Sequence, residues 1–269
     1  MPIVRRMRKS GTMINMYLRL FLFEVLISGL LSAQAAKPTP STFAVIQELV
    51  TANHILANEG VLDGYGHVSV RNPSNPNHYF LARAGAPSLV TAADIVEYDL
   101  DSNPQTPGAA SGYLERFIHG EIYKARPEVM SVIHCHCAEV IPFADTGVPM
   151  QPMHHMGWFI GQGVPVFDIR KVAGETNILV GSPMLGKALA ESLGNRTAVL
   201  MRGHGAAIAG TSLHLVVGMA YYLNLNARLQ YQAMQLGGGK VTYLDAEESK
   251  RAVQDYERSW DDWKSKLRK

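Results

Sequence analysis

Residues 129–137 read Val-Met-Ser-Val-Ile-His-Cys-His-Cys, a β-rich run with two histidines at alternate positions. Alternate side chains of an extended strand point to the same face, so we expect His134 and His136 to lie together on one face of a sheet. Two imidazoles buried side by side without partners would be costly, and one chelated cation satisfies both. The run therefore predicts a strand that carries part of a metal site, and a pair of core histidines is the alternative.

Two cysteines, Cys135 and Cys137, alternate with these histidines, and the chain has no others. Residues two apart on an extended strand share a face, but that spacing does not favour a bond between their sulfurs. We therefore expect two packed thiols.

The segments on either side of this run alternate between helical and extended patterns, without an internal repeat. They predict one α/β domain over residues 43–269, built on a mixed sheet. Helical patterns cover residues 43–58, 115–124, 185–193 and 213–234, and a last helix starts at the capping residue Asp245. Extended patterns cover residues 67–71, 79–81, 95–98, 129–137, 164–167 and 198–201.

The first 35 residues have the pattern of an export signal. Five cations precede the apolar run 20–31, and Ala33-Gln34-Ala35 offers small residues for cleavage. Translation could also start at Met13 or Met16. The apolar run falls short of the about 20 residues that a bilayer span requires, so no stable span is expected after processing.

This N-terminal segment determines the expected location of the protein. Residues 36–42, which include Lys37-Pro38-Thr39-Pro40-Ser41, read as a linker to the folded domain. We expect a periplasmic or secreted protein. A membrane anchor is the alternative, or a cytoplasmic protein if translation starts later.

Composition narrows the class of partner. Apolar residues make up 47% of the chain and charged residues 18%, so it can bury a core and is not of the disordered class. The net charge is only +2, and several cations lie in the first twenty residues. No nucleic-acid surface is implied, and a small-molecule substrate is expected.

A third candidate ligand, His204, lies in Arg202-Gly203-His204-Gly205, directly after the strand predicted at 198–201. The flanking glycines allow a sharp turn that places the imidazole at a sheet edge. Three imidazoles with an open coordination position match a catalytic rather than a structural metal site. Four other histidines compete for this role: His119, His154, His155 and His214.

Glu115 opens the helix before the His134 strand, where a solvated first-turn acid is the plain interpretation. Its position in the chain changes that interpretation. The order of three motifs resembles the class II aldolase/adducin family: a Glu at this helix start, then His-X-His, then a distant Gly-His-Gly. Residues 66–71, 89–96 and 125–127 add to the resemblance, which covers essentially all of the chain after the predicted signal.

The resemblance implies a three-layer α/β/α domain with a central mixed, largely antiparallel sheet. It also implies a homotetramer of fourfold symmetry with active sites between subunits. His134, His136 and His204 match the family's metal ligands, and Glu115 matches the acid that binds the resting metal and then acts as base. Zinc is usual in the aldolases and manganese or another divalent ion serves some relatives, a choice that imidazole ligands alone do not determine.

The chain departs from the pattern of sugar-phosphate aldolases at three places. Those enzymes carry an Asn after the first Gly, a Thr-Pro-Ser-Gly-like loop and a Ser-Ser pair before the acid. This chain has His67, Ala82-Arg83-Ala84-Gly85 and Tyr113-Leu114 there, so most hydroxyl donors for a phosphate are gone. Arg83 could pair with a carboxylate, and Tyr113 could lie along a planar ring.

These departures resemble the branch of the family that decarboxylates hydroxylated aromatic or pyridine carboxylic acids. A metal chelated by a substrate hydroxyl and carboxylate stabilises the carbanion or enolate left when carbon dioxide departs. Glu115, or His155 at the place of an aldolase tyrosine, would supply the proton. We therefore expect a metal-dependent lyase with His67, Arg83 and Tyr113 at the substrate.

Other functions remain open. A class II aldolase would use the same site to release an aldehyde from a hydroxyketone or a sugar phosphate. An adducin-like interaction module would need no catalysis, although such relatives tend to lose the histidines that this chain keeps. An exported metal-binding protein without catalysis is also possible.

Overall fold

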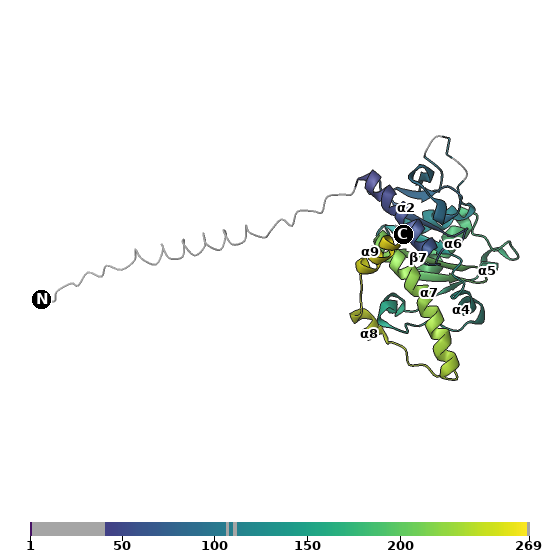
Figure 1. Ribbon diagram of the computed structural model, residues 1–269, viewed down its shortest axis with the longest axis vertical. Coiled ribbons are helices and arrows are strands. Elements are labelled where there is room, and N and C mark those ends of the chain that lie inside the picture. The colour runs from purple at the N-terminus through teal and green to yellow at the C-terminus, as the bar shows by residue number, and fades with distance from the viewer. Residues whose placement is uncertain (2–40, 106–107, 110–111, 268–269) are drawn as a thin grey trace. The chain divides into compact units, whose positions relative to one another are not determined.

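The computed structural model describes residues 1, 41–105, 108–109 and 112–267, and residues 40–269 form one compact unit (Figure 1). The predicted export signal and linker residues 36–40 lie outside the described part. Ser41 and Thr42, assigned to the linker from sequence, instead start the first helix, because the Ser41 hydroxyl accepts the N–H of Ala44. No helix in the described ranges has the length and apolar character that a bilayer crossing requires.

A seven-stranded sheet forms the centre of this unit, with the order β3-β2-β1-β4-β7-β6-β5. Neighbouring strands are antiparallel except for the pair β5 and β6. The prediction of a mixed, largely antiparallel sheet is thus confirmed. The strands are β1 (His67–Arg71), β2 (His78–Ala82), β3 (Ile95–Asp99), β4 (Ser131–Cys135), β5 (Val166–Phe167), β6 (Ala198–Met201) and β7 (Gly205–Gly210).

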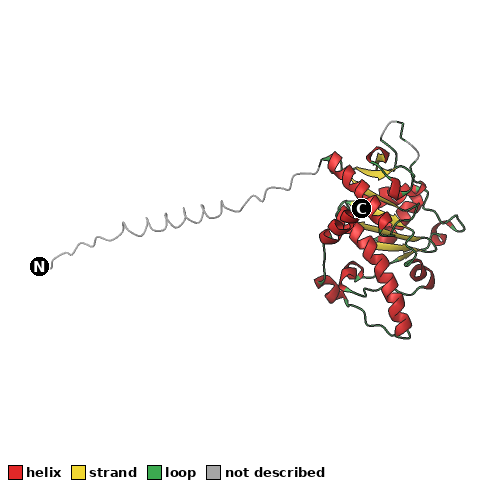
Figure 2. Cartoon of the chain, viewed as in Figure 1, coloured by secondary structure: helices red, strands yellow, loops and turns green. Residues whose placement is uncertain are grey.

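Helices cover both faces of the sheet, as Figure 2 shows with strands in yellow between helices in red. Side chains alternate along each strand, so Ile133 packs with α2, α7 and α9 on one face while Val132 packs with α3 and α6 on the other. The predicted three-layer α/β/α architecture is confirmed. The α-helices are α2 (Thr42–Asn58), α3 (Phe117–Ala125), α4 (Ile141–Thr146), α5 (Arg170–Ala173), α6 (Pro183–Leu193), α7 (Leu213–Leu236), α8 (Ala246–Arg251) and α9 (Glu257–Lys266).

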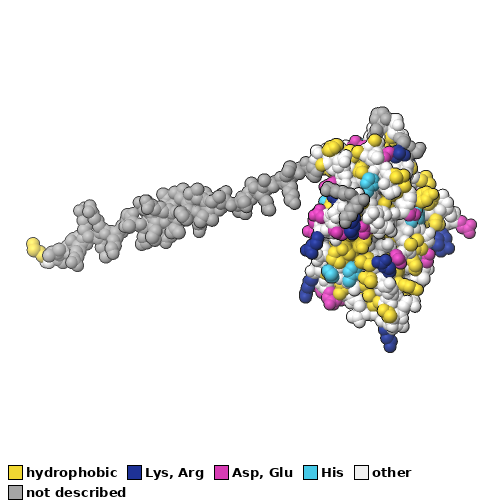
Figure 3. All heavy atoms as spheres, in the orientation of Figure 1, with side chains coloured by type: hydrophobic (Ala, Val, Ile, Leu, Met, Phe, Trp, Pro, Cys, Tyr) yellow, Lys and Arg dark blue, Asp and Glu magenta, His cyan; other side chains and the backbone are white. Residues whose placement is uncertain are grey.

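Short 3-10 helices connect several of these elements: η1 (Pro87–Leu89), η2 (Ala92–Asp94), η3 (Leu114–Arg116) and η4 (His155–Ile160). The single C-terminal helix expected from Asp245 is divided into α8 and α9. Cationic and anionic side chains are interspersed on the face that Figure 3 shows.

Strand β7 was missed from the sequence, although it lies between β4 and β6 in the middle of the sheet. Its residues, Gly-Ala-Ala-Ile-Ala-Gly, carry little of the β-branched and aromatic character typical of strands. Small side chains are needed here, since a Cβ on Gly205 would overlap the carbonyl oxygen of Cys135. Close approach of β7 to β4 therefore depends on glycine at this position.

The expectation of two free thiols was wrong, because Cys135 and Cys137 form a disulfide. That expectation assumed an extended strand through both residues, but β4 ends at Cys135. The two Cα atoms lie 5.2 Å apart, within the range that a disulfide spans.

Candidate active site

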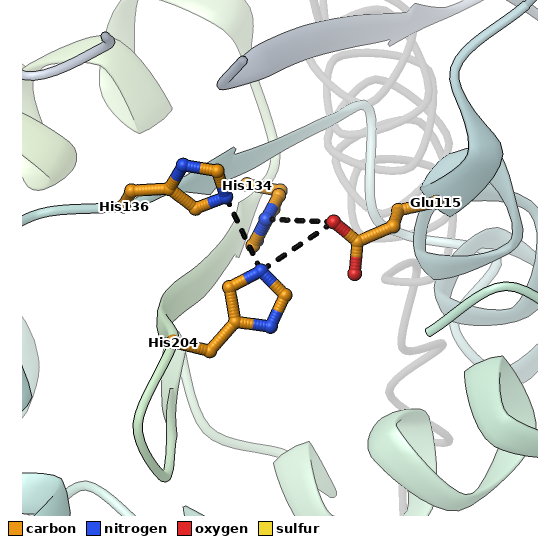
Figure 4. Close-up of side chains that lie close together, drawn as sticks. All are labelled: Glu115, His134, His136 and His204. Carbon is orange, nitrogen blue, oxygen red and sulfur yellow. Dashed lines mark hydrogen bonds and ion pairs between the residues drawn. The ribbon is translucent and has the colours of Figure 1, made fainter. Parts of the chain in front are cut away.

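The candidate metal ligands come together at one edge of the sheet. Strands β4 and β6 both run antiparallel to β7 between them, so their C-terminal ends meet at the same edge. His134 lies on β4, His136 directly follows it, and His204 lies in the turn between β6 and β7. Glu115 reaches this edge from η3, on the sheet face that α3 covers (Figure 4).

Four side chains converge there, each with one ligand atom within 4.8 Å of the others. Nε2 of His136 lies 3.2 Å from Nε2 of His204. Oε2 of Glu115 lies 3.4 Å from Nε2 of His134 and 3.4 Å from Nε2 of His204. The structure thus assembles the ligand set predicted from sequence, and this cluster could hold a metal ion.

Hydrogen bonds at the outer nitrogens orient the three rings. Each Nδ1 faces an oxygen that can only accept, so each Nδ1 carries the proton and each neutral ring has its lone pair on Nε2. The acceptors are the Ala206 carbonyl for His134 (3.1 Å), the Asp63 carboxylate for His136 (3.0 Å) and the Ile178 carbonyl for His204 (3.1 Å).

The Nε2 lone pairs of the three histidines are arranged to bind a cation. Lone pairs of His136 and His204 face each other at 3.2 Å, which is unfavourable without a positive charge between them. Nε2 of His134 is buried and has no hydrogen-bond partner in the part of the chain that the structure describes. Ligands about 2.1 Å from a tetrahedral ion lie about 3.4 Å from one another, close to the separations in this cluster. The donor set therefore fits a divalent metal.

Glu115 is held as an anion next to these rings, although the residue is only 7% exposed. Burial raises the pKa of its carboxyl, and the pKa falls below its ordinary value where a proton on Nε2 of His134 or His204, or a cation in that place, faces Oε2. The backbone N–H of Val180 donates to Oε1 at 2.8 Å. Oε2 is left to face the histidines.

Asp63 and Val180 are site residues that the sequence did not reveal. Asp63 lies in the turn before β1, where it also accepts the N–H groups of Tyr65 and Gly66 at 2.9 Å each. Partial burial raises the pKa of Asp63, but these donors and His136 lower it below its ordinary value. A carboxylate on the outer nitrogen fixes a ligand ring and increases its basicity. An acid in the Gly-rich turn before a strand was the available signal.

Aromatic rings line the site next to His134. The ring of His67 lies 5.1 Å from that of His134, its cross-strand partner on β1, and the ring of Tyr113 lies 4.4 Å from that of His67. The Tyr113 hydroxyl donates to the carbonyl of Gly85 at 2.6 Å. Burial raises the pKa of Tyr113 to about 12, so this donor stays protonated. Tyr113 thus presents its ring rather than its hydroxyl.

Arg83 lies next to Tyr113 on the side away from His67, because it forms a backbone bridge with Gly112. Nε of Arg83 donates to Oδ1 of Asp94 at 2.5 Å, and both residues line a pocket of about 140 Å³. The two terminal nitrogens of the guanidinium have no hydrogen-bond partner among the described residues, so they can bind another anion. The predicted substrate residues His67, Tyr113 and Arg83 therefore follow one another outward from the metal cluster.

His155 is the predicted catalytic residue that lies outside the cluster. It is exposed at the start of η4, and its ring contacts that of His154 at 6.1 Å. Within one chain, this histidine is not positioned to exchange a proton at Glu115.

The fold and the cluster together define the class of protein. Residues 47–231 match the family described as Class II Aldolase and Adducin N-terminal domain. The chain belongs to the class II aldolase/adducin family, as the sequence motifs predicted.

Particular relatives refine this assignment. The chain is 41% identical over 204 residues to decarboxylase tropJ of Talaromyces stipitatus, across 71% of this chain and 77% of that protein. It is 30% identical over 227 residues to a 3,4-dihydroxyphthalate decarboxylase of Arthrobacter keyseri, across 78% and 87%. An L-fuculose 1-phosphate aldolase from Glaciozyma antarctica PI12 shares the fold, with a TM-score of 0.69 and 21% identity over 86% of this chain and 92% of that one.

The relatives from Talaromyces stipitatus and Arthrobacter keyseri are both named as decarboxylases. The predicted position within the family, closer to the decarboxylase branch than to the sugar-phosphate aldolases, is confirmed. Decarboxylases and aldolases are both lyases, so the prediction of a lyase agrees with these relatives.

Proposed function

We propose that this protein is a divalent-metal-dependent decarboxylase of a hydroxylated aromatic or heteroaromatic carboxylic acid. One observation carries the proposal: the flat rings of His67 and Tyr113 extend outward from the metal-capable cluster. A phosphate site would instead need several hydroxyl and amide donors that converge at this place. The decarboxylase relatives support the same substrate class.

His134, His136 and His204 would hold the ion, with Glu115 as a fourth ligand in the resting state. When bound, zinc or manganese would supply a Lewis acid for a substrate hydroxyl and carboxylate and an electron sink for the pair left by departing carbon dioxide. Burial lowers the pKa of His134, only partly offset by Glu115, so its nitrogen stays free of a second proton and able to bind a cation.

The substrate would lie along the ring of Tyr113 and reach Arg83 with a second carboxylate that is retained. The two terminal nitrogens of Arg83 match the two oxygens of a carboxylate in a bidentate pair. Asp94 holds the opposite edge of the guanidinium through Nε. This positioning fixes the direction in which Arg83 can bind an anion.

A proton must replace carbon dioxide on the ring carbon. Oε2 of Glu115 faces the cluster, and this oxygen would take up a proton and return it to that carbon. His155 is the second candidate donor, and since it is exposed and lies outside the cluster of its own chain, it would act on the site of another copy of the chain. We include a homotetramer with sites between subunits in the proposal for this reason.

The test is a mass-spectrometric screen of the zinc- and manganese-loaded protein. Hydroxylated aromatic and pyridine carboxylic acids form one panel and sugar phosphates the other, with release of carbon dioxide and of aldehyde as readouts. We expect carbon dioxide from the first panel. Aldehyde from a sugar phosphate, with every aromatic acid unchanged, would replace the decarboxylase by an aldolase.

A further inference from the structure

Behind His67, four buried polar side chains form one row of hydrogen bonds. Nδ1 of His67 lies 2.7 Å from Nε2 of His119, and Nδ1 of His119 lies 2.6 Å from Oγ of Ser69. Oγ of Ser69 in turn lies 2.8 Å from the hydroxyl of Tyr123. All four residues are at most 1% exposed. The roles described so far use only the first of them.

The far end of the row sets the direction of its protons. Burial raises the pKa of Tyr123 well above its ordinary value, so the phenol keeps its proton. Among the described residues, Oγ of Ser69 is the one hydrogen-bond acceptor within reach of this hydroxyl. A buried donor needs an acceptor, so Tyr123 donates to Ser69.

The remaining protons follow in order. Ser69 has a single proton, which it donates to Nδ1 of His119. His119 then carries its proton on Nε2 and donates it to Nδ1 of His67. The last step does not depend on the charge of His119, because an imidazolium also donates from Nε2. The opposite order would leave the buried phenol proton of Tyr123 without an acceptor.

We propose that Tyr123, Ser69 and His119 hold His67 as the tautomer protonated at Nε2. With Nδ1 occupied as an acceptor, the Nε2–H is the group that His67 can offer to a ligand. That nitrogen has no hydrogen-bond partner among the described residues, and the ring lies between Tyr113 and His134. His119 and Ser69 are therefore positioning residues that make His67 a hydrogen-bond donor.

For the substrate, this donor selects an oxygen on which negative charge builds, such as the hydroxyl or carboxylate oxygen of the acid. A fixed neutral N–H stabilises such an oxygen without giving up its proton. This assignment of the ligand rests on the proposed function, whereas the tautomer itself does not.

The tautomer can be read directly from ¹⁵N NMR spectra of the zinc-loaded protein, labelled at histidine, without substrate. His67→Gln identifies the resonances of His67 by their loss. We expect a protonated Nε2 and an unprotonated Nδ1 for His67 in the wild type. A proton on Nδ1 of His67 would overturn the proposal.

Variants of Ser69 test whether the row controls the tautomer. Ser69→Ala removes the donor to His119, and both tautomers of His67 should then be detected. Ser69→Thr keeps a hydroxyl and should restore the single tautomer. Tyr79→Phe is the matched control, because the Tyr79 ring stacks near His119 at 6.3 Å while its hydroxyl donates to Ser102 outside the row. An unchanged tautomer in Ser69→Ala would contradict control by this row.

Kinetics separate this inference from the proposed function. With the best aromatic acid from the screen, Ser69→Ala should lower kcat by about tenfold, less than the roughly 10²-fold or more that loss of one such donor costs. The zinc content and KM of Ser69→Ala should stay unchanged, and so should the activity of Tyr79→Phe. If no aromatic acid is turned over, the proposed function fails while the NMR result still decides the tautomer. Unchanged kcat in Ser69→Ala despite a mixed tautomer would remove the substrate-donor role of His67.

Discussion

The backbone N–H of Val180 donates to Oε1 of Glu115 across 2.8 Å, and so fixes which oxygen of the carboxylate faces the histidines. Val180 comes from the loop before α6, 65 residues away in sequence. The carboxylate is thus held at one oxygen while the other remains able to bind a cation or carry a proton. This division of roles makes the acid at position 115 testable.

Replacing Glu115 by Gln should lower turnover by roughly 10²–10⁴-fold, the contribution typical of a positioned acid–base group. The amide keeps a carbonyl oxygen for the Val180 N–H, so folding and most of the metal content should be retained. Steady-state kinetics with elemental analysis of the same sample measure both.

Glu121→Gln is the matched control, since Glu121 is a second buried acid, on the neighbouring helix α3, and it pairs with Lys124 at 2.6 Å. It should keep wild-type turnover. Equal rates for Glu115→Gln and the wild type would reduce Glu115 to a structural acid.

Metal content provides a second prediction. Protein purified without chelator should contain one divalent ion per chain, and His204→Ala should lose most of it because a three-imidazole site loses a ligand. His155→Ala should retain the metal, since His155 lies outside the cluster, yet lose turnover if it donates the proton. Elemental analysis of the three proteins gives the answer. A wild type without stoichiometric metal, or a His204→Ala variant that keeps it, would be incompatible with the site.

The sequence was sufficient to identify the residues of the cluster and insufficient to identify what orients them. His134, His136 and His204 belong to local patterns, a strand run and a glycine turn, so their types and spacing indicated a metal. Asp63 lies 73 residues from His136, and only the paired strands bring the two together. Local patterns carry no information about such contacts, because they depend on the sheet order.

The same limit explains the errors in the fold. Strand β7 was missed because close packing against β4 selects small residues, which removes the usual β-branched signal. The disulfide was missed because the end of β4 at Cys135 changes the geometry of the next two residues. In both places tertiary packing outweighs local preference.

Stability should depend on pH through His119. Burial, and to a lesser extent His134, lower its pKa from 6.5 to about 3 in the folded protein, with Glu115 opposing. As pH falls, His119 therefore binds a proton in the unfolded chain before it does so in the folded protein. The contribution of this residue to stability is complete above pH 6.5 and is lost as pH falls from 6.5 toward 3. The slope from one such group reaches about 1.4 kcal/mol per pH unit.

Urea denaturation of the metal-free protein between pH 7.5 and pH 5 checks this, over roughly the range in which carboxyl groups stay ionised. The free energy of unfolding should fall toward pH 5 in the wild type and fall less steeply in His119→Gln. Parallel curves for the two proteins would show that His119 titrates alike in the folded and unfolded states.

The last prediction concerns Arg83 and the retained carboxylate. Asp94, which also accepts the N–H and hydroxyl of Thr91 at 2.8 and 2.7 Å, holds Nε of Arg83. No described residue bonds the terminal nitrogens, which we expect to bind the substrate. Hydrogen bonds to a charged partner contribute about 1.5–3 kcal/mol, so Arg83→Met should raise KM for the aromatic acid by about 10- to 100-fold. Metal content should not change, because Arg83 is exposed and lies outside the cluster.

Two further variants make this test specific for a bidentate pair. Arg83→Lys keeps the charge but not the planar fork, so its KM should lie between those of the wild type and Arg83→Met. Arg170→Met is the matched control, since Arg170 is another exposed arginine paired with an aspartate, Asp168, at 3.4 Å. It should leave KM unchanged. If Arg83→Met keeps the wild-type KM, or if Arg170→Met raises it equally, a carboxylate bound by Arg83 is ruled out as the determinant of substrate class.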